Sequence, residues 1–381
     1  MDLIPSVVDQ FIAAPEHARH DLQTSPWVVI WEVTQACQLA CRHCRASAQP
    51  HRHPLELSTA EGKRLLEEVA RLNPAVLVLT GGDPLERDDI YELVGHAAAL
   101  GLEVAFTPSG TPLLTPAAIS RLQSSGVRRL ALSLDGASAA THDDFRGVGG
   151  SFAITLQAAQ AAARLSLPVQ INTTATRRNR AELPALRAVL DTLQIAMWSV
   201  FFLIPTGRAQ RGEMLSADET EELFAFLYQT GARGQYLVRT TEAPHYRRYL
   251  RQARHGAGSA DPAQRWARRA VPRGIGDGSG FVFISHTGEI YPSGFLPLSA
   301  GNVRYHRLGE VYRHAPLFQA LRDRERLKGK CGVCEYRHLC GGSRARAYAL
   351  TGDYLAADSG CNYQPRASAQ KAVSAADISV T

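Results

Sequence analysis

The sequence predicts an α/β fold, a partial TIM-like (β/α)6 barrel followed by a small, cysteine-rich C-terminal domain. Short apolar segments alternate with longer segments of helical periodicity, and the loops that join them are short. This alternation is typical of parallel strands connected by right-handed helical crossovers. Four of the seven cysteines lie within residues 331–361, which sets the C-terminal segment apart from the barrel.

Six apolar segments are the predicted strands. They are short, mostly apolar and rich in Val, Ile, Leu and Phe, which is typical of strands buried on both faces. They cover residues 27–33, 75–80, 102–107, 129–134, 169–174 and 198–204.

A predicted helix follows each strand. The first begins after Ser58, an N-cap candidate, and places Leu65, Leu66 and Val69 on one face. The predicted helices cover residues 59–72, 88–100, 115–124, 151–163, 180–193 and 216–231. Ligands of such barrels gather at the carboxyl ends of the strands, so we expect the functional site there.

Composition divides the rest of the chain. Residues 251–280 are rich in Gly, Ala and Arg and break the alternation. Beyond them, His286-Thr287-Gly288 lies between two short apolar segments and predicts a hairpin. We expect an N-terminal extension over 1–26, the barrel over 27–232, a basic linker or mobile region over 233–280, the cysteine-rich domain over 281–365 and a disordered tail over 366–381.

The bulk composition is that of a globular protein. Hydrophobic residues make up 45% of the 381 residues, and the net charge of +6 is only mildly basic, so we expect no nucleic-acid partner. No apolar run is long enough to span a membrane, and the N-terminus lacks the features of a signal peptide. We therefore expect a cytoplasmic protein without a membrane partner, where reduced thiols favour metal binding over disulfides.

Three cysteines follow the first predicted strand directly, as Cys37-Gln-Leu-Ala-Cys41-Arg-His-Cys44. Three thiolates at this spacing can hold one [4Fe–4S] cluster from a single loop and leave the fourth iron open. An open iron can bind a substrate or a cofactor. The spacing alone also allows a zinc site that a nearby histidine completes.

Polar motifs follow two later strands. Gly81-Gly82-Asp83-Pro84 comes after the second strand, and its glycines allow the backbone to approach a ligand closely. By itself it is also a good turn sequence. Ser133 and Asp135 come at the end of the fourth strand, and Arg146 follows them.

Together these motifs resemble those of the radical S-adenosylmethionine (SAM) superfamily. The resemblance implies that the open iron of the cluster on Cys37, Cys41 and Cys44 binds SAM. One electron then cleaves SAM into methionine and a 5′-deoxyadenosyl radical, which takes a hydrogen atom from the substrate. The residues that the resemblance assigns to SAM are Gly81, Gly82, Asp83, Pro84, Ser133, Asp135, Arg146, Asn172, Thr174, Leu203 and Ile204. A surface ion pair explains Arg146 equally well, and strand propensity explains Thr174.

The four remaining cysteines form a second motif, C-x2-C-x5-C-x20-C, made of Cys331, Cys334, Cys340 and Cys361. Four thiolates can complete an iron–sulfur cluster or a structural zinc site, and spacing alone does not separate the two. The segment resembles the auxiliary-cluster region of SPASM/twitch radical SAM proteins. The sequence motifs around Cys340 resemble those of the radical SAM enzymes of alternative heme and heme d1 synthesis. Because Ser293 stands where a further cysteine is usual, we expect one auxiliary [4Fe–4S] cluster.

The resemblance leaves the substrate open. One class is a tetrapyrrole whose propionate side chain is decarboxylated or removed, and the basic residues Arg247, Arg248, Arg251, Arg268, Arg269 and Arg273 suit its carboxylates. The other class is a peptide that receives a crosslink or a thioether. Both need a reducing partner such as ferredoxin or flavodoxin. A third hypothesis is a non-catalytic iron–sulfur or zinc regulator.

Overall fold

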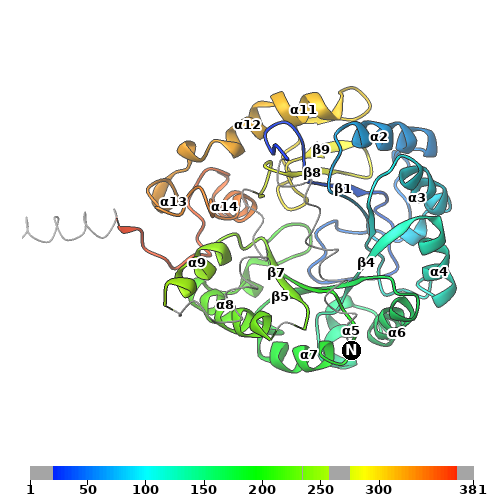
Figure 1. The fold of residues 1–381 in the computed structure, drawn as a ribbon, viewed down its shortest axis with the longest axis horizontal. Helices are drawn as coiled ribbons and strands as arrows, with labels where there is room; N and C mark the ends of the chain where they lie inside the picture. The colour runs from blue at the N-terminus through cyan, green and yellow to red at the C-terminus, as the bar shows by residue number, and fades with distance from the viewer. Residues whose placement is uncertain (1–19, 234, 257–274, 367–381) are drawn as a thin grey trace, which may run out of the picture.

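The computed structural model describes residues 20–233, 235–256 and 275–366. Most of the predicted N-terminal extension, the basic segment 257–274 and nearly all of the predicted tail lie outside these residues. The described chain forms one ten-stranded sheet in the order β10-β9-β8-β1-β2-β3-β4-β5-β6-β7. Figure 1 shows the sheet curving around a central space, with the helices on the outside. The predicted α/β partial barrel is therefore confirmed.

The six predicted strands are present, and each pairs in parallel with the next. They are β1 (Val28–Glu32), β2 (Val76–Thr80), β3 (Val104–Phe106), β4 (Val127–Ser133), β5 (Val169–Ala175) and β6 (Met197–Phe202). A seventh parallel strand, β7 (Leu237–Thr241), pairs with β6 within the predicted linker. The apolar pattern missed β7 because only its first two residues, Leu237 and Val238, are apolar.

The predicted hairpin is present, but it joins the sheet of the barrel. It consists of β8 (Phe281–Ile284) and β9 (Glu289–Tyr291), and β10 (Gly301–Asn302) pairs with β9. β8 lies parallel to β1, so the C-terminal segment extends the barrel at the edge opposite to β7. The domain boundaries proposed from composition remain a prediction.

The six predicted helices are present with shifted ends, and two further helices, Ala139–Arg146 and Tyr246–Gly256, were not predicted. Ser58 caps the first of them in a capping box with Glu61. The barrel helices are α2 (Thr59–Arg71), α3 (Ile90–Ala99), α4 (Pro116–Ser125), α5 (Ala139–Arg146), α6 (Ser151–Arg164), α7 (Leu183–Leu190), α8 (Ala217–Ala232) and α9 (Tyr246–Gly256). The C-terminal helices are α11 (Leu308–His314), α12 (Pro316–Arg322), α13 (Gly329–Gly332) and α14 (Arg344–Thr351).

The inner face of the barrel is less buried than the sequence predicts. In β5, buried and half-buried residues alternate. Val169 and Ile171 are buried in the core, whereas Gln170, Asn172 and Thr174 are only half-buried. β1 and β2 also have half-buried residues between buried ones, whereas β3 and all but one residue of β6 are buried, as the sequence predicts. Among the described residues, no helix is long and apolar enough to cross a membrane.

Candidate functional site

The first three cysteines lie in the loop after β1. Cys37 and Cys41 are buried and Cys44 is half-buried. Burial raises the pKa of Cys37 to about 11, and it also raises the pKa of Cys41, where the charge of Arg146 opposes the shift. Backbone amides of Leu39 and Ala48 each donate to a thiol at 3.3 Å. Metal binding displaces the protons of such thiols, so this donor set fits an iron–sulfur cluster.

The glycine motif after β2 lies in backbone contact with this cysteine loop. Gly82 donates to Thr34 O at 2.8 Å, and Asp83 donates to Ala36 O at 2.7 Å. A Cβ atom on Gly82 would collide with the carbonyls of Gln35 and Ala36. The motif therefore does more than turn the chain, because it holds the start of the cysteine loop from the neighbouring strand.

The carboxylate of Asp83 is occupied by loop contacts that the motif did not predict. It accepts hydrogen bonds from Thr111 Oγ1 at 2.7 Å and from the amides of Leu85 and Ser109 at 3.2 and 3.3 Å. Burial raises its pKa to about 6, although these donors oppose the shift. Asp83 thus joins the loops after β2 and β3, and its contact with SAM remains a prediction.

Arg146 and Asp135 form an ion pair that is buried, so the surface interpretation of Arg146 is wrong. Their side chains are 11% and 0% exposed. Arg146 Nη1 lies 3.8 Å from Cys41 Sγ, and Asp135 Oδ1 accepts from Thr174 N at 2.7 Å. The fold thus gathers Arg146, Asp135 and Thr174 at the cysteine loop.

The remaining predicted SAM contacts lie on the ends of β4, β5 and β6. Ser133 is the register partner of Asn172, and both are half-buried on the inner face. Leu203 and Ile204 follow β6 and are buried, and Ile204 packs with Leu296 of the C-terminal segment. Their contacts with SAM remain predictions.

Two residues at the cysteine loop were not among the predicted site residues, one from a distant segment and one within the loop. Arg208, after β6, donates from Nε to Cys41 O at 2.9 Å and from Nη1 to Ala48 O at 3.1 Å. Its buried Nη2 has no hydrogen-bond partner among the residues that the structure describes. The buried ring of His43 lies 4.6 Å from that of Phe145. Burial lowers the pKa of His43 to about 4. The position of His43 inside the motif was a signal, whereas nothing in the sequence links Arg208 to the loop.

Comparisons with known proteins agree with this geometry. The family profile of the Radical SAM superfamily matches residues 31–187. The AdoMet-dependent heme synthase of Methanosarcina barkeri is 39% identical over 90% of this chain and 98% of that protein. This chain belongs to the radical SAM superfamily.

More distant similarity supports the same family and fold. The PqqA peptide cyclase of Methylocella silvestris is 28% identical over 90% of this radical SAM chain and 88% of its own length. The crystal structure of Streptococcus suis SuiB bound to S-adenosylmethionine matches with a TM-score of 0.69 at 16% identity, over 89% of this chain and 78% of that chain. That likeness shows the fold alone. Membership of the superfamily implies an enzyme with a [4Fe–4S] cluster and SAM, as predicted.

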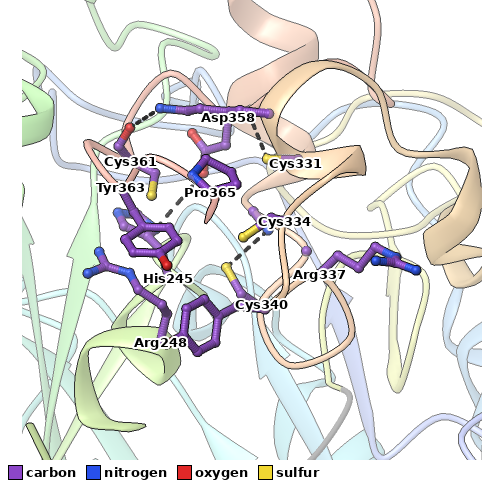
Figure 2. Close-up of a pocket in the computed structure, with 14 residues that line it drawn as sticks. His245, Arg248, Cys331, Cys334, Arg337, Cys340, Asp358, Cys361, Tyr363 and Pro365 are labelled. Atoms are coloured by element: carbon purple, nitrogen blue, oxygen red, sulfur yellow. Dashed lines mark hydrogen bonds and ion pairs between the residues drawn. The ribbon is translucent and has the colours of Figure 1, made fainter. Parts of the chain in front are cut away.

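The four C-terminal cysteines of this radical SAM chain line one pocket, which Figure 2 shows. Burial raises the pKa of Cys340 to about 12. Asp358 N donates to Cys331 Sγ at 3.4 Å, and Gly342 N donates to Cys340 Sγ at 3.3 Å. Three cations, Arg248, Lys330 and Arg337, also line the pocket, together with the anion Asp358.

The thiols of both motifs are not gathered for a single ion. Within the part of the chain that the structure describes, no three His, Cys, Asp or Glu side chains converge closely enough to hold one metal ion. Zinc requires its donors around one point, whereas each thiolate of a four-iron cluster binds a different iron. An auxiliary iron–sulfur cluster on the four C-terminal cysteines remains a prediction.

Proposed function

We propose that this radical SAM enzyme decarboxylates propionate side chains of an iron tetrapyrrole. The observation that carries the proposal is the 39% identity to a heme synthase, which extends over 90% of this chain and nearly all of that protein. The likeness to a peptide cyclase is weaker, at 28% identity.

The residues of the first site have distinct roles in this proposal. When bound, the cluster and SAM supply a 5′-deoxyadenosyl radical. Arg146 keeps a positive charge beside the thiolate of Cys41, and Asp135 fixes the position of Arg146. Gly82 and Arg208 hold the loop that carries the three cysteines. The half-buried inner face of β4 and β5 provides the polar lining on which we place SAM.

The atoms and electrons of the proposed reaction balance as follows. The 5′-deoxyadenosyl radical takes one hydrogen atom from the β-carbon of a propionate and leaves as 5′-deoxyadenosine. The substrate radical then breaks its bond to the carboxylate. It releases carbon dioxide and one electron, and a vinyl group remains. The reaction therefore needs an electron acceptor near the substrate.

An auxiliary [4Fe–4S] cluster on Cys331, Cys334, Cys340 and Cys361 is the acceptor that we propose. The common pocket of these cysteines and its three cations support this assignment. Of the arginines predicted to bind propionates, Arg248 pairs with Glu221 at 2.6 Å and Arg247 donates to Ile275 O at 2.5 Å. Arg268, Arg269 and Arg273 lie outside the described residues. We further propose a ferredoxin or flavodoxin as reductant and a cytoplasmic location.

The test is anaerobic. The protein is reconstituted with iron and sulfide, reduced, and given SAM with iron coproporphyrin, and the products are separated and weighed by mass spectrometry. We expect about eight irons per chain, together with 5′-deoxyadenosine and a vinyl product. About four irons with bound zinc would remove the auxiliary acceptor but keep the radical chemistry. Absence of 5′-deoxyadenosine from the fully loaded protein would favour the regulator hypothesis.

A further inference from the structure

His245 reaches the four-cysteine pocket from the barrel side. It lies between β7 and α9, and its fully buried ring packs edge-on against Phe224 of α8, with ring centroids 4.8 Å apart. It lines the same pocket as the four cysteines, which all come from the C-terminal segment (Figure 2). The barrel therefore supplies His245 to the lining of the four-cysteine pocket.

The His245 ring lacks the hydrogen bonds that its burial calls for. Both ring nitrogens are buried, and among the described residues neither makes a hydrogen bond of good geometry, the backbone of Gly360 being at most a weak partner. The carboxylate of Asp358 is close to the ring, but its Oδ2 lies 3.9 Å from Nδ1, beyond hydrogen-bond distance. Buried polar groups are almost always paired, so an unpaired ring at the edge of a pocket indicates a partner that occupies the pocket.

Asp358 determines which nitrogen faces that partner. Its carboxylate is fixed by the amides of Ser343 and Gly360 at 2.8 and 2.9 Å and by Arg346 Nη1 at 2.9 Å. Its own amide donates to the thiol of Cys331. Because Asp358 stands on the Nδ1 side of the ring, Nε2 is the nitrogen left for the pocket.

We propose that His245 is a positioning residue that donates a hydrogen bond from Nε2 to a sulfur of the auxiliary cluster and raises its reduction potential. This inference rests on the proposed function, because it requires a cluster at the four cysteines. A hydrogen bond to a cluster sulfur stabilises the reduced, more negative form. The cluster then accepts the electron from decarboxylation more readily.

The test measures the potential of the auxiliary cluster alone. The full chain carries Cys37→Ala, Cys41→Ala and Cys44→Ala, so that the cluster on the other four cysteines gives the only signal, and its midpoint potential is titrated by electron paramagnetic resonance. We expect His245→Leu to shift the potential to a more negative value. His245→Gln keeps an N–H donor and restores most of the potential. His338→Leu is the matched control, because His338 lies between two of the cysteines in sequence but is 65% exposed and contacts Glu325.

Each outcome decides the inference. An unchanged potential in His245→Leu, with about four irons bound, would overturn the role of His245 and leave the auxiliary cluster standing. Zinc in place of iron would overturn both. If His245→Leu loses its iron, pulsed electron paramagnetic resonance on the intact chain with ¹⁵N-labelled histidine tests the hydrogen bond instead. A weak nitrogen coupling that disappears in His245→Gln supports the hydrogen bond, and its absence from the parent chain refutes it.

Discussion

Arg146 provides the counter-charge of a buried carboxylate beside the first site. Its partner Asp135 is fully buried, so removal of the guanidinium leaves a buried carboxylate without its counter-charge. Breaking a buried ion pair from one side costs about 3–5 kcal/mol. We expect Arg146→Met to lower the free energy of unfolding by this amount, measured by urea denaturation of the metal-free protein.

Arg42 provides the matched control for this substitution. Arg42 pairs at 2.8 Å with Asp144 of α5, the helix that carries Arg146, but both side chains of this pair are about half exposed. Exposed pairs contribute about 0–1 kcal/mol. Arg42→Met should therefore change the stability little, and an equal loss in both variants would contradict the role of burial.

Asp83 makes the stability of the protein depend on pH. Burial raises its pKa to about 6 in the folded state, above the ordinary value of 3.8. The folded protein therefore binds this proton more tightly than the unfolded chain does. The resulting stabilisation is complete below the ordinary pKa and is lost as pH rises through about 6, by about 3 kcal/mol in total.

Asp83→Asn tests this dependence. The amide oxygen of Asn can still accept from the amides of Leu85 and Ser109, while the titrating group is gone. Unfolding by urea between pH 4.5 and 7.5 should show a smaller loss of stability with rising pH in the variant than in the parent protein. Parallel pH profiles would show that Asp83 does not titrate as its burial implies.

At the scale of elements, the segment after β6 supports the cysteine loop from a distant part of the chain. Gly207 has a φ of +60°, and a Cβ atom there would collide with the carbonyls of Cys44 and Arg45. A side chain must therefore displace the loop. We expect Gly207→Ala to destabilise the protein by about 1–3 kcal/mol and to reduce the iron that remains bound after desalting.

Gly212 is the control in the same segment. It lies in the short 3-10 helix Arg211–Glu213, and apart from its chain neighbours and the backbone of its own helix, no heavy atom of the described residues lies within 4 Å of an added Cβ. Gly212→Ala should keep the iron content and stay within about 0.5 kcal/mol of the parent stability. A loss of iron in this variant as well would mean that the effect at Gly207 is not specific to the cysteine loop.

A second connection joins the cysteine loop to the C-terminal hairpin. Arg45 follows Cys44, pairs with Glu32 at 2.7 Å and donates to Gly294 O at 3.3 Å. Glu32 also contacts His286 Nδ1 at 2.7 Å. Because β8 pairs with β1 beside this network, the two halves of the chain meet next to the first site.

At the scale of the whole molecule, the first cysteine site follows β1 whereas the second lies beyond the last strand, β10, and the two sites should have separable roles. We expect Cys334→Ala to form 5′-deoxyadenosine from SAM without forming the vinyl product, because the first site is intact and the acceptor is lost. Cys37→Ala should form neither. Both products are measured in the same anaerobic assay, and full product formation by Cys334→Ala would refute the electron-acceptor role.

Local sequence patterns predict those features that depend on neighbours along the chain. Six strands and their helices follow from local periodicity, since an apolar segment of strand length must be buried wherever it lies. The two cysteine motifs also follow from spacing, because a single loop such as that of Cys37 and Cys44 can supply several ligands to one cluster. The family and the chemistry could therefore be predicted before the fold was known.

Only the tertiary structure decided which distant residues surround those motifs. β7 carries too few apolar residues to predict, and it forms because β6 offers it an open edge. The pairing of Arg146 with Asp135 and Cys41, the support of the loop by Arg208 and the place of His245 beside the four cysteines all join separate segments. Such contacts depend on the path of the chain around the barrel. A buried charge or ring nitrogen needs a partner, and sequence spacing does not encode which distant residue that partner is.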